Sequence, residues 1–301
     1  MIEAHAHLSY NKVFPEYFLD DIIDDVVCQS EVQDCRARRI AKSMLNSTLE
    51  DKDGKQLIEI MDNCGIHKSV LLAVDLFYCV NNNEDLSELE EVHKLYYDAY
   101  LLHPNRFVLF AGIDPNRGEK GLKFFDDCVL KYNFKGLKLY PPTGFEINDD
   151  IVYPYYERCQ RYKLPVYYHV GPSAKSMKNT SNYPNSVFDV ANKYPGVIFI
   201  LGHAGILHID DSLEISKKHP NVYLEISGFQ KEIEDYEYIR AKFRRLFDLV
   251  PNQILFGTDW PLFSRKYTTE RCISYIRDIC DESNYDSNLI FYSNAVKAFG
   301  L

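Results

Sequence analysis

The sequence predicts an α/β protein built as one (β/α)8 TIM barrel with a lid-like insertion after the first strand. Three observations predict this fold: eight short apolar runs recur, amphipathic segments separate them, and no hairpin signal joins two runs. A dinucleotide-binding fold is disfavoured because no Gly-x-Gly-x-x-Gly follows any run. The runs expected to form strands are residues 2–7, 69–74, 107–113, 136–140, 165–170, 197–203, 222–227 and 254–259.

The segments between the runs carry apolar residues at helical spacing. In residues 87–102, Leu89, Val92 and Leu95 fall on one side of a helix. Proline or glycine then marks the entry into the next strand, as Pro104 does after this segment. Further helices are expected over residues 118–132, 150–162, 186–193, 212–219, 232–249 and 268–280.

The segment 9–65 is too long for an ordinary strand–helix connection. It is rich in Asp, Glu and Arg, and it contains Phe14 and Phe18 as packing residues. Because it has too few apolar residues to fold alone, the prediction is a single domain over residues 1–301. Within it, the insertion is expected to cover the barrel mouth and to end in the first barrel helix near residues 55–63.

The composition argues against several classes of partner. The 44 acidic and 34 basic residues give a net charge of −10, whereas a nucleic-acid-binding protein needs a basic face. No run approaches the roughly 18 apolar residues of a membrane span, so no membrane partner is expected. The first residues lack the basic and apolar regions of a signal peptide. The eight cysteines show no Cys-x-x-Cys spacing, which favours a reduced, cytoplasmic protein.

Two histidines lie on the first predicted strand, in His5-Ala6-His7. Side chains two residues apart on a strand point to the same face, so both imidazoles can face the barrel mouth. Such a pair can hold a divalent metal ion. A pair of surface histidines is the alternative interpretation, because His-x-His often occurs by chance.

Three further polar residues end predicted strands: His169, His203 and Asp259. Barrel enzymes place their chemistry at these carboxyl ends. Four imidazoles and a carboxylate would be costly to bring together without a purpose, and a metal ion supplies one. The other histidines fall in predicted helices or loops and are interpreted as ordinary polar residues: His67, His93, His103, His208 and His219.

These motifs resemble those of the amidohydrolase superfamily. The resemblance rests on His5-x-His7, His169, Gly202-His203-Ala204-Gly205 and Gly257-Thr258-Asp259-Trp260-Pro261. It runs from the first strand to the last helix. It is strongest to the amidohydrolase-related group that contains aminocarboxymuconate-semialdehyde decarboxylase, resorcylate decarboxylase and pyrone-dicarboxylate lactonase. That group often has Asp two residues before the first histidine, where this chain has Glu3.

The resemblance implies that His5, His7 and His169 are metal ligands. Asp259 would be a fourth ligand, or the base that deprotonates a metal-bound water. His203 would stand beside the metal and polarise a substrate oxygen or carry a proton. One divalent ion is implied, zinc in the first place and manganese as the alternative. Bound zinc lowers the pKa of its water to about 7, which makes hydroxide accessible at neutral pH.

The expected substrate side consists of Lys138, Tyr140, Trp260 and Glu225. Lys138 ends the fourth predicted strand and is expected to bind a substrate carboxylate. Two alternatives stay open for it: a carboxylated lysine bridging two metals, as in part of the superfamily, and a salt bridge with Asp259 or Glu225. Tyr140 and Trp260 are expected to be pocket walls, and Glu225 could orient a ligand histidine.

The sequence therefore favours a metal-dependent hydrolase acting on a small, carboxylate-bearing substrate through a metal-activated water. A metal-dependent, non-oxidative decarboxylase of an aromatic or unsaturated acid at the same site is the alternative. A non-catalytic binding barrel is disfavoured, because binding alone needs no proton shuttle. The expected partners are a small-molecule substrate and, from the habit of the family, a second copy of the chain in a homodimer.

Overall fold

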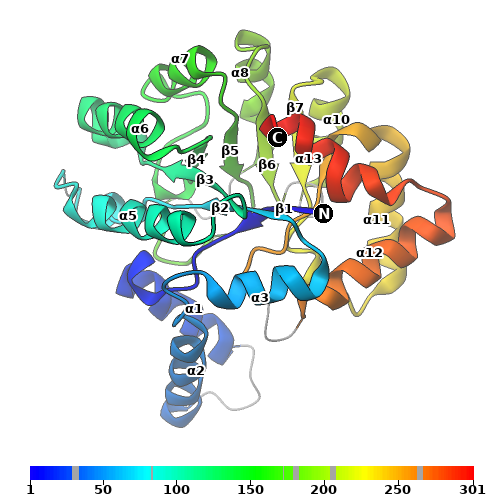
Figure 1. Ribbon diagram of the computed structural model, residues 1–301, viewed down its shortest axis with the longest axis horizontal. Helices are drawn as coiled ribbons and strands as arrows, with labels where there is room; N and C mark the ends of the chain where they lie inside the picture. The colour runs from blue at the N-terminus through cyan, green and yellow to red at the C-terminus, as the bar shows by residue number, and fades with distance from the viewer. Residues whose placement is uncertain (29–33, 83, 172, 179–182, 204–207, 263–266) are drawn as a thin grey trace.

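The barrel expected from the sequence is present. The computed structural model describes residues 1–28, 34–82, 84–171, 173–178, 183–203, 208–262 and 267–301. Eight parallel strands follow one another around a ring in sequence order (Figure 1). The ring closes where Ala6 bridges Trp260 and where the N–H of Ala4 donates to the carbonyl of Phe256 over 2.7 Å. The strands are β1 (Ile2–Ala6), β2 (Lys68–Leu72), β3 (Phe107–Gly112), β4 (Leu137–Leu139), β5 (Val166–His169), β6 (Phe199–Gly202), β7 (Val222–Glu225) and β8 (Ile254–Leu255).

Helices carry the connections and surround the strands (Figure 1). The predicted helices are present, two of them with the predicted bounds (87–102 and 118–132) and the others with shifted ends. Helix α11, for example, begins after Asp235, whose carboxylate accepts from the N–H of Tyr238. None of the described helices is long and apolar enough to span a bilayer. The helices are α1 (Glu16–Cys28), α2 (Cys35–Thr48), α3 (Lys55–Cys64), α4 (Tyr78–Asn81), α5 (Ser87–Leu102), α6 (Gly118–Tyr132), α7 (Tyr153–Tyr162), α8 (Val187–Lys193), α10 (Ile209–Lys218), α11 (Tyr236–Leu249), α12 (Thr269–Ser283) and α13 (Asn294–Phe299).

The core has two apolar layers, one inside the barrel and one between the strands and the helices. Alternate strand residues pack inside the barrel, among them Val70, Phe110 and Ile200. The last helix, α13, adds Phe299 to this layer, with its ring centroid 5.8 Å from that of Phe110. The opposite strand faces pack against the surrounding helices in a larger apolar layer. The interior is therefore a packed core rather than a pore.

The predicted insertion between β1 and β2 folds as two helices, α1 and α2, that pack against each other, followed by the first barrel helix, α3. An antiparallel bridge between Tyr10 and Glu50 brings its two ends together. Asp25 on α1 lies 3.0 Å from the Lys175 ammonium, which ties the insertion to the connection after β5. Its role as a lid stays a prediction.

Candidate metal centre

The five residues that the sequence singles out meet at the carboxyl ends of the strands. His5 lies in β1 and His7 just after it, His169 ends β5, and His203 and Asp259 follow β6 and β8. All five line one cavity. His203 and Asp259 have φ angles of 60° and 54°, in the left-handed region that few residues other than glycine adopt. Strained backbone of this kind concentrates at functional sites.

Part of the cavity lining is apolar and forms a wall beside the polar residues. Two rings of the insertion, Phe14 and Phe18, stack with centroids 5.9 Å apart and form part of that wall. Val74 and Leu76 follow β2 and extend it. An apolar wall excludes water from the polar groups and strengthens their electrostatic interactions. The lining residues are His5, His7, Phe14, Phe18, Val74, Leu76, Lys138, Tyr140, His169, His203, Asp259 and Leu262.

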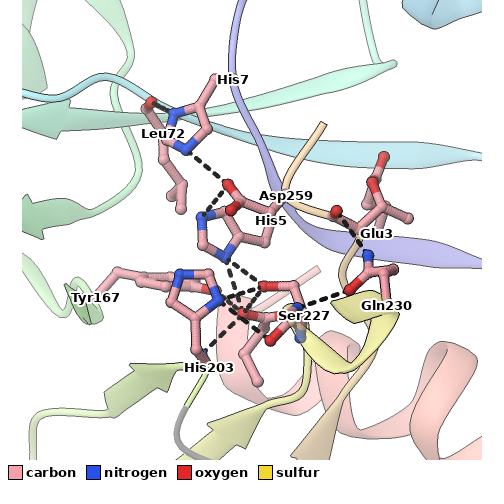
Figure 2. Close-up of polar contacts among 12 residues, drawn as sticks. Glu3, His5, His7, Leu72, Tyr167, His203, Ser227, Gln230 and Asp259 are labelled. Atoms are coloured by element: carbon pink, nitrogen blue, oxygen red, sulfur yellow. Dashed lines mark hydrogen bonds and ion pairs between the residues drawn. The ribbon is translucent and has the colours of Figure 1, made fainter. Parts of the chain in front are cut away.

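The buried carboxylate of Asp259 lies between the imidazoles of His5 and His7 (Figure 2). Its Oδ1 is 3.3 Å from Nε2 of His5 and 3.2 Å from Nε2 of His7. Burial raises the pKa of Asp259, but the nearby His5, His7 and His203 outweigh it, so the pKa lies well below its usual value. Asp259 is therefore an anion at neutral pH.

The hydrogen bonds of the two imidazoles fix which ring nitrogen carries hydrogen. Nδ1 of His5 lies 2.8 Å from Oε2 of Glu225, and Nδ1 of His7 lies 2.7 Å from the carbonyl of Leu72. Both partners are acceptors, so both Nδ1 atoms donate, and in a neutral ring Nε2 keeps its lone pair. Two lone pairs and a carboxylate oxygen thus face one another. Acceptors arranged in this way suit a divalent cation. Imidazole nitrogen and carboxylate oxygen are ligands that bind ions such as Zn²⁺.

His203 is close enough to join this group. Ligand atoms of His5, His203 and Asp259 all lie within 4.8 Å of one another, and all three side chains are buried. Burial lowers the pKa of His203 to about 4, so its imidazole is neutral at physiological pH. His169 is partly exposed, and its ring centroid lies 5.0 Å from that of His203 and 4.6 Å from that of Tyr140. His169 therefore lines the same cavity from the side of β5.

Glu225 lies behind His5 rather than on the cavity wall, although the sequence placed it among the substrate contacts. Its Oε2 accepts from His5, from the hydroxyl of Tyr167 at 2.9 Å and from the hydroxyl of Ser227 at 2.8 Å. Burial raises the pKa of Glu225, but His5 and the other nearby groups lower it by more, so the pKa lies below its usual value. Its contacts are those of a residue that orients a ligand histidine.

Of the remaining expected substrate contacts, Lys138 and Tyr140 line the cavity. The Lys138 ammonium lies 4.6 Å from the ring centroid of Tyr167, and burial lowers the pKa of Lys138 to about 8. Trp260 is not among the lining residues. Instead, its carbonyl accepts from the N–H of His7 at 2.8 Å and helps to close the barrel. In this structure, Trp260 thus supports the seam between β1 and β8.

Sequence reasoning missed the supporting role of Ser227 and assigned no contacts to Glu3. Ser227 contacts both His5 and Glu225, and only its position two residues after Glu225 on the same face could have pointed to it. Glu3 lies under the site, where it accepts from Ser69 at 2.9 Å and from Thr258. Burial raises the pKa of Glu3 to about 7, while the two hydroxyl donors oppose the rise. Glu3 thus anchors the backbone next to Asp259.

Solved structures share this architecture. A 5-carboxyvanillate decarboxylase from Sphingomonas paucimobilis is similar with a TM-score of 0.66 and 15% identity, over 100% of this chain and 99% of that one. The enzyme of the same name from Novosphingobium aromaticivorans, complexed with manganese, gives 0.62 and 17%, over 100% and 95%. A 4-oxalomesaconate hydratase from Rhodopseudomonas palustris gives 0.63 and 16%, over 100% and 95%.

At these identities the similarity establishes the fold and not the reaction. No curated protein matches the sequence. The amidohydrolase family model, however, matches residues 2–301. That range includes every strand of the barrel and all of the residues that face the metal centre. The chain therefore belongs to the amidohydrolase family.

Proposed function

We propose that this protein is a metal-dependent hydrolase of a small, carboxylate-bearing substrate. The observation that carries the proposal is the Asp259 carboxylate held between the lone pairs of His5 and His7, with its pKa lowered. A single divalent ion, zinc or manganese, would be held by His5, His7, His169 and Asp259. It would supply the positive charge that polarises water and substrate oxygens.

The proton steps are assigned to Asp259 and His203. Asp259 accepts a proton from the attacking water, since it is an anion that faces the cavity. His203, neutral and on the same cavity, takes part in moving that proton towards the leaving group. Phe14 and Phe18 keep bulk water away while the proton moves.

Lys138 is assigned to a carboxylate of the substrate. Among the described residues that line the cavity, it is the one with an aliphatic ammonium group. The lining also includes apolar side chains: Phe14, Phe18, Val74, Leu76 and Leu262. A flat, apolar molecule with one anionic group matches that wall and that charge.

Decarboxylation of an aromatic or unsaturated acid is the second candidate. Two observations favour it: the apolar wall, which disfavours a carboxylate relative to neutral carbon dioxide, and the decarboxylases among the similar folds. In that reaction Lys138 and the metal would hold the substrate's oxygens, and Asp259 or His203 would deliver a proton to carbon.

Metal analysis of protein purified without chelators tests the common part of both candidates. About one equivalent of zinc or manganese is expected, and two equivalents would support a carboxylated Lys138. Protein that contains no metal and takes none up on titration would overturn the proposal. A panel of lactones, amides and aromatic acids, with acid formation and carbon dioxide release measured side by side, then distinguishes hydrolysis from decarboxylation.

A further inference from the structure

Ser227, which none of the roles above uses, connects the two buried histidines to Glu225. Its hydroxyl oxygen lies 2.8 Å from Nδ1 of His203, 3.2 Å from Nδ1 of His5 and 2.8 Å from Oε2 of Glu225. Its carbonyl oxygen lies 3.1 Å from the same Nδ1 of His203. Ser227 is fully buried, and within the described part of the chain these groups are the partners of its hydroxyl (Figure 2).

Counting donors assigns the hydrogens. Nδ1 of His5 donates, because Glu225 is an acceptor. Ser227 has one hydroxyl hydrogen, and it can go to Glu225 or to Nδ1 of His203. The carbonyl of Ser227 also faces that Nδ1 and can only accept.

The two choices differ in what they leave unsatisfied. If the hydroxyl donates to Nδ1 of His203, that nitrogen's lone pair is used, and the carbonyl of Ser227 beside it loses its donor. Glu225 would lose the Ser227 hydroxyl but keep His5 and the Tyr167 hydroxyl as donors, so the carbonyl of Ser227 is the group left unsatisfied. If the hydroxyl donates to Glu225, Nδ1 of His203 donates to the hydroxyl and carbonyl oxygens, and every group is satisfied. In a buried network each unsatisfied group costs about 1–3 kcal/mol, so the second choice wins.

We propose that Ser227 is a positioning residue that fixes the tautomer of His203. It holds hydrogen on Nδ1, so the neutral ring presents the lone pair of Nε2, the nitrogen that these contacts leave available. His203 then accepts a proton or ligates a metal ion, and it does not donate to a substrate oxygen while it is neutral. This inference rests on the proposed function for its consequence in turnover, but the tautomer itself is measurable without substrate.

The backbone after β7 explains why Ser227 is followed by Gly228. Residues 225 and 227 share one face of the strand end, which brings the hydroxyl back to Glu225. Gly228 follows with φ of 95°, and a Cβ there would lie 3.6 Å from Nδ1 of His203. The positive φ turns the chain beneath the imidazole, where glycine has no steric cost.

The test uses metal-free full-length protein labelled with ¹⁵N-histidine, in which long-range ¹H–¹⁵N spectra at neutral pH distinguish the two tautomers. A His203→Gln variant identifies the signals of His203. We expect the Nδ1–H form in the unmodified protein. Ser227→Ala removes the hydroxyl and leaves the carbonyl of residue 227 as the one remaining acceptor of this pair, so a measurable Nε2–H population should appear beside the Nδ1–H form. Ser227→Thr, which keeps the hydroxyl, should restore the first pattern. Ser212→Ala removes a buried serine whose hydroxyl has no partner among the described residues, and it should change nothing.

Steady-state kinetics provide a second test. Ser227→Ala should lower kcat by about 10- to 100-fold, as loss of a supporting group around a metal site does, with KM and metal content little changed. An Nε2–H form of His203 in the unmodified protein would overturn the inference, as would an unchanged tautomer in Ser227→Ala. Absence of any activity would instead count against the proposed function, since the spectra do not depend on it.

Discussion

Oε2 of Glu225 lies 2.8 Å from Nδ1 of His5, on the side of the imidazole that faces away from the cavity. This contact fixes Nδ1 as the donor and leaves Nε2 to face Asp259. The geometry is that of a carboxylate that orients a metal-binding histidine and increases its basicity. The orientation of His5 at the candidate metal site therefore depends on a residue that does not itself face the cavity.

Glu225→Gln should weaken metal binding by about 10- to 100-fold, because an amide holds His5 less firmly than a carboxylate does. Titration of the metal-free variant with zinc, followed by calorimetry, measures the loss. Glu214→Gln, which neutralises an exposed glutamate on α10, is the matched control and should bind metal normally. Equal affinities for the Glu225 variant and the unmodified protein would contradict the orienting role.

Gly257→Ala should damage the same contact by steric means. A Cβ at residue 257 would lie 2.3 Å from Oε1 of Glu225 and 2.7 Å from Cβ of His5, so both must shift. Overpacking of this kind costs about 1–3 kcal/mol, and we expect the metal affinity to fall with the stability. Urea unfolding and metal titration measure the two effects. Gly196→Ala, where a Cβ would meet nothing within 4 Å, should leave both nearly unchanged.

Asp259→Asn should separate the base from the ligand. The variant keeps the three histidines, so it should retain most of its metal, while kcat falls by about 10²- to 10⁴-fold. His5→Ala is the comparison, and it should lose metal because it removes a ligand outright. If Asp259→Asn loses as much metal as His5→Ala, Asp259 acts mainly as a ligand, and the assignment of the base is wrong.

Lys138→Met should lower kcat/KM for an anionic substrate by about 10- to 100-fold, the size of a lost charged hydrogen bond. The same change should stabilise the fold, because Lys138 is buried and burial already lowers its pKa to about 8. Kinetics and thermal unfolding of one preparation test the fall in kcat/KM and the rise in stability. Lys123→Met, at an exposed position on α6, should do neither.

His93 should make the stability of the metal-free protein depend on pH. It is buried, Nδ1 lies 2.8 Å from the carbonyl of Leu89, Nε2 accepts from the N–H of Gly112, and burial lowers its pKa to about 4. Between pH 6.5 and 4 the unfolded chain binds the proton and the folded one does not. The contribution of neutral His93 to the free energy of unfolding is therefore present above pH 6.5. It is lost as the pH falls towards 4, by up to about 3 kcal/mol.

The measurement compares urea unfolding at pH 7 and pH 5 in chelator. His93→Gln should be less stable at pH 7, since a buried hydrogen-bonding partner is replaced. Its free energy of unfolding should, however, fall less between pH 7 and pH 5 than that of the unmodified protein. His67→Gln, at an exposed position, should keep the slope of the unmodified protein. An identical slope in all three proteins would remove His93 from the explanation.

The strand pattern was predictable because each strand of a barrel is buried on both faces and so appears as a short apolar run. The eighth strand shows the limit. The run 254–259 predicts a strand of that length, but β8 ends at Leu255. Beyond it, the N–H of Phe256 donates to Ile290, and Asp259 takes a positive φ. A hydrogen bond to a distant helix is invisible in local sequence.

The residues that line the metal centre were predictable from their places at strand ends, but the supporting contacts were not. Glu225 and His5 meet across the barrel interior, and which atoms touch depends on register and rotamers that no spacing rule encodes. Trp260 shows the reverse case. It was expected to be a pocket wall, but it is not among the residues that line the cavity, and its carbonyl joins the hydrogen bonds that close the barrel.

The closing seam of the barrel has a consequence for how the protein matures. The N–H of Asp259 donates to the carbonyl of His5 at 2.9 Å. The first imidazole thus lies on the first strand, and the carboxylate lies on the segment that follows the last strand. A growing polypeptide on the ribosome can display the paired imidazoles long before it has made the acid. A metal ion held by His5 and Asp259 would therefore bind with full affinity only after the first strand and the segment after the eighth have come together. Such an ion would stabilise this seam, and hydrogen exchange after chelation should then rise first in β1 and β8.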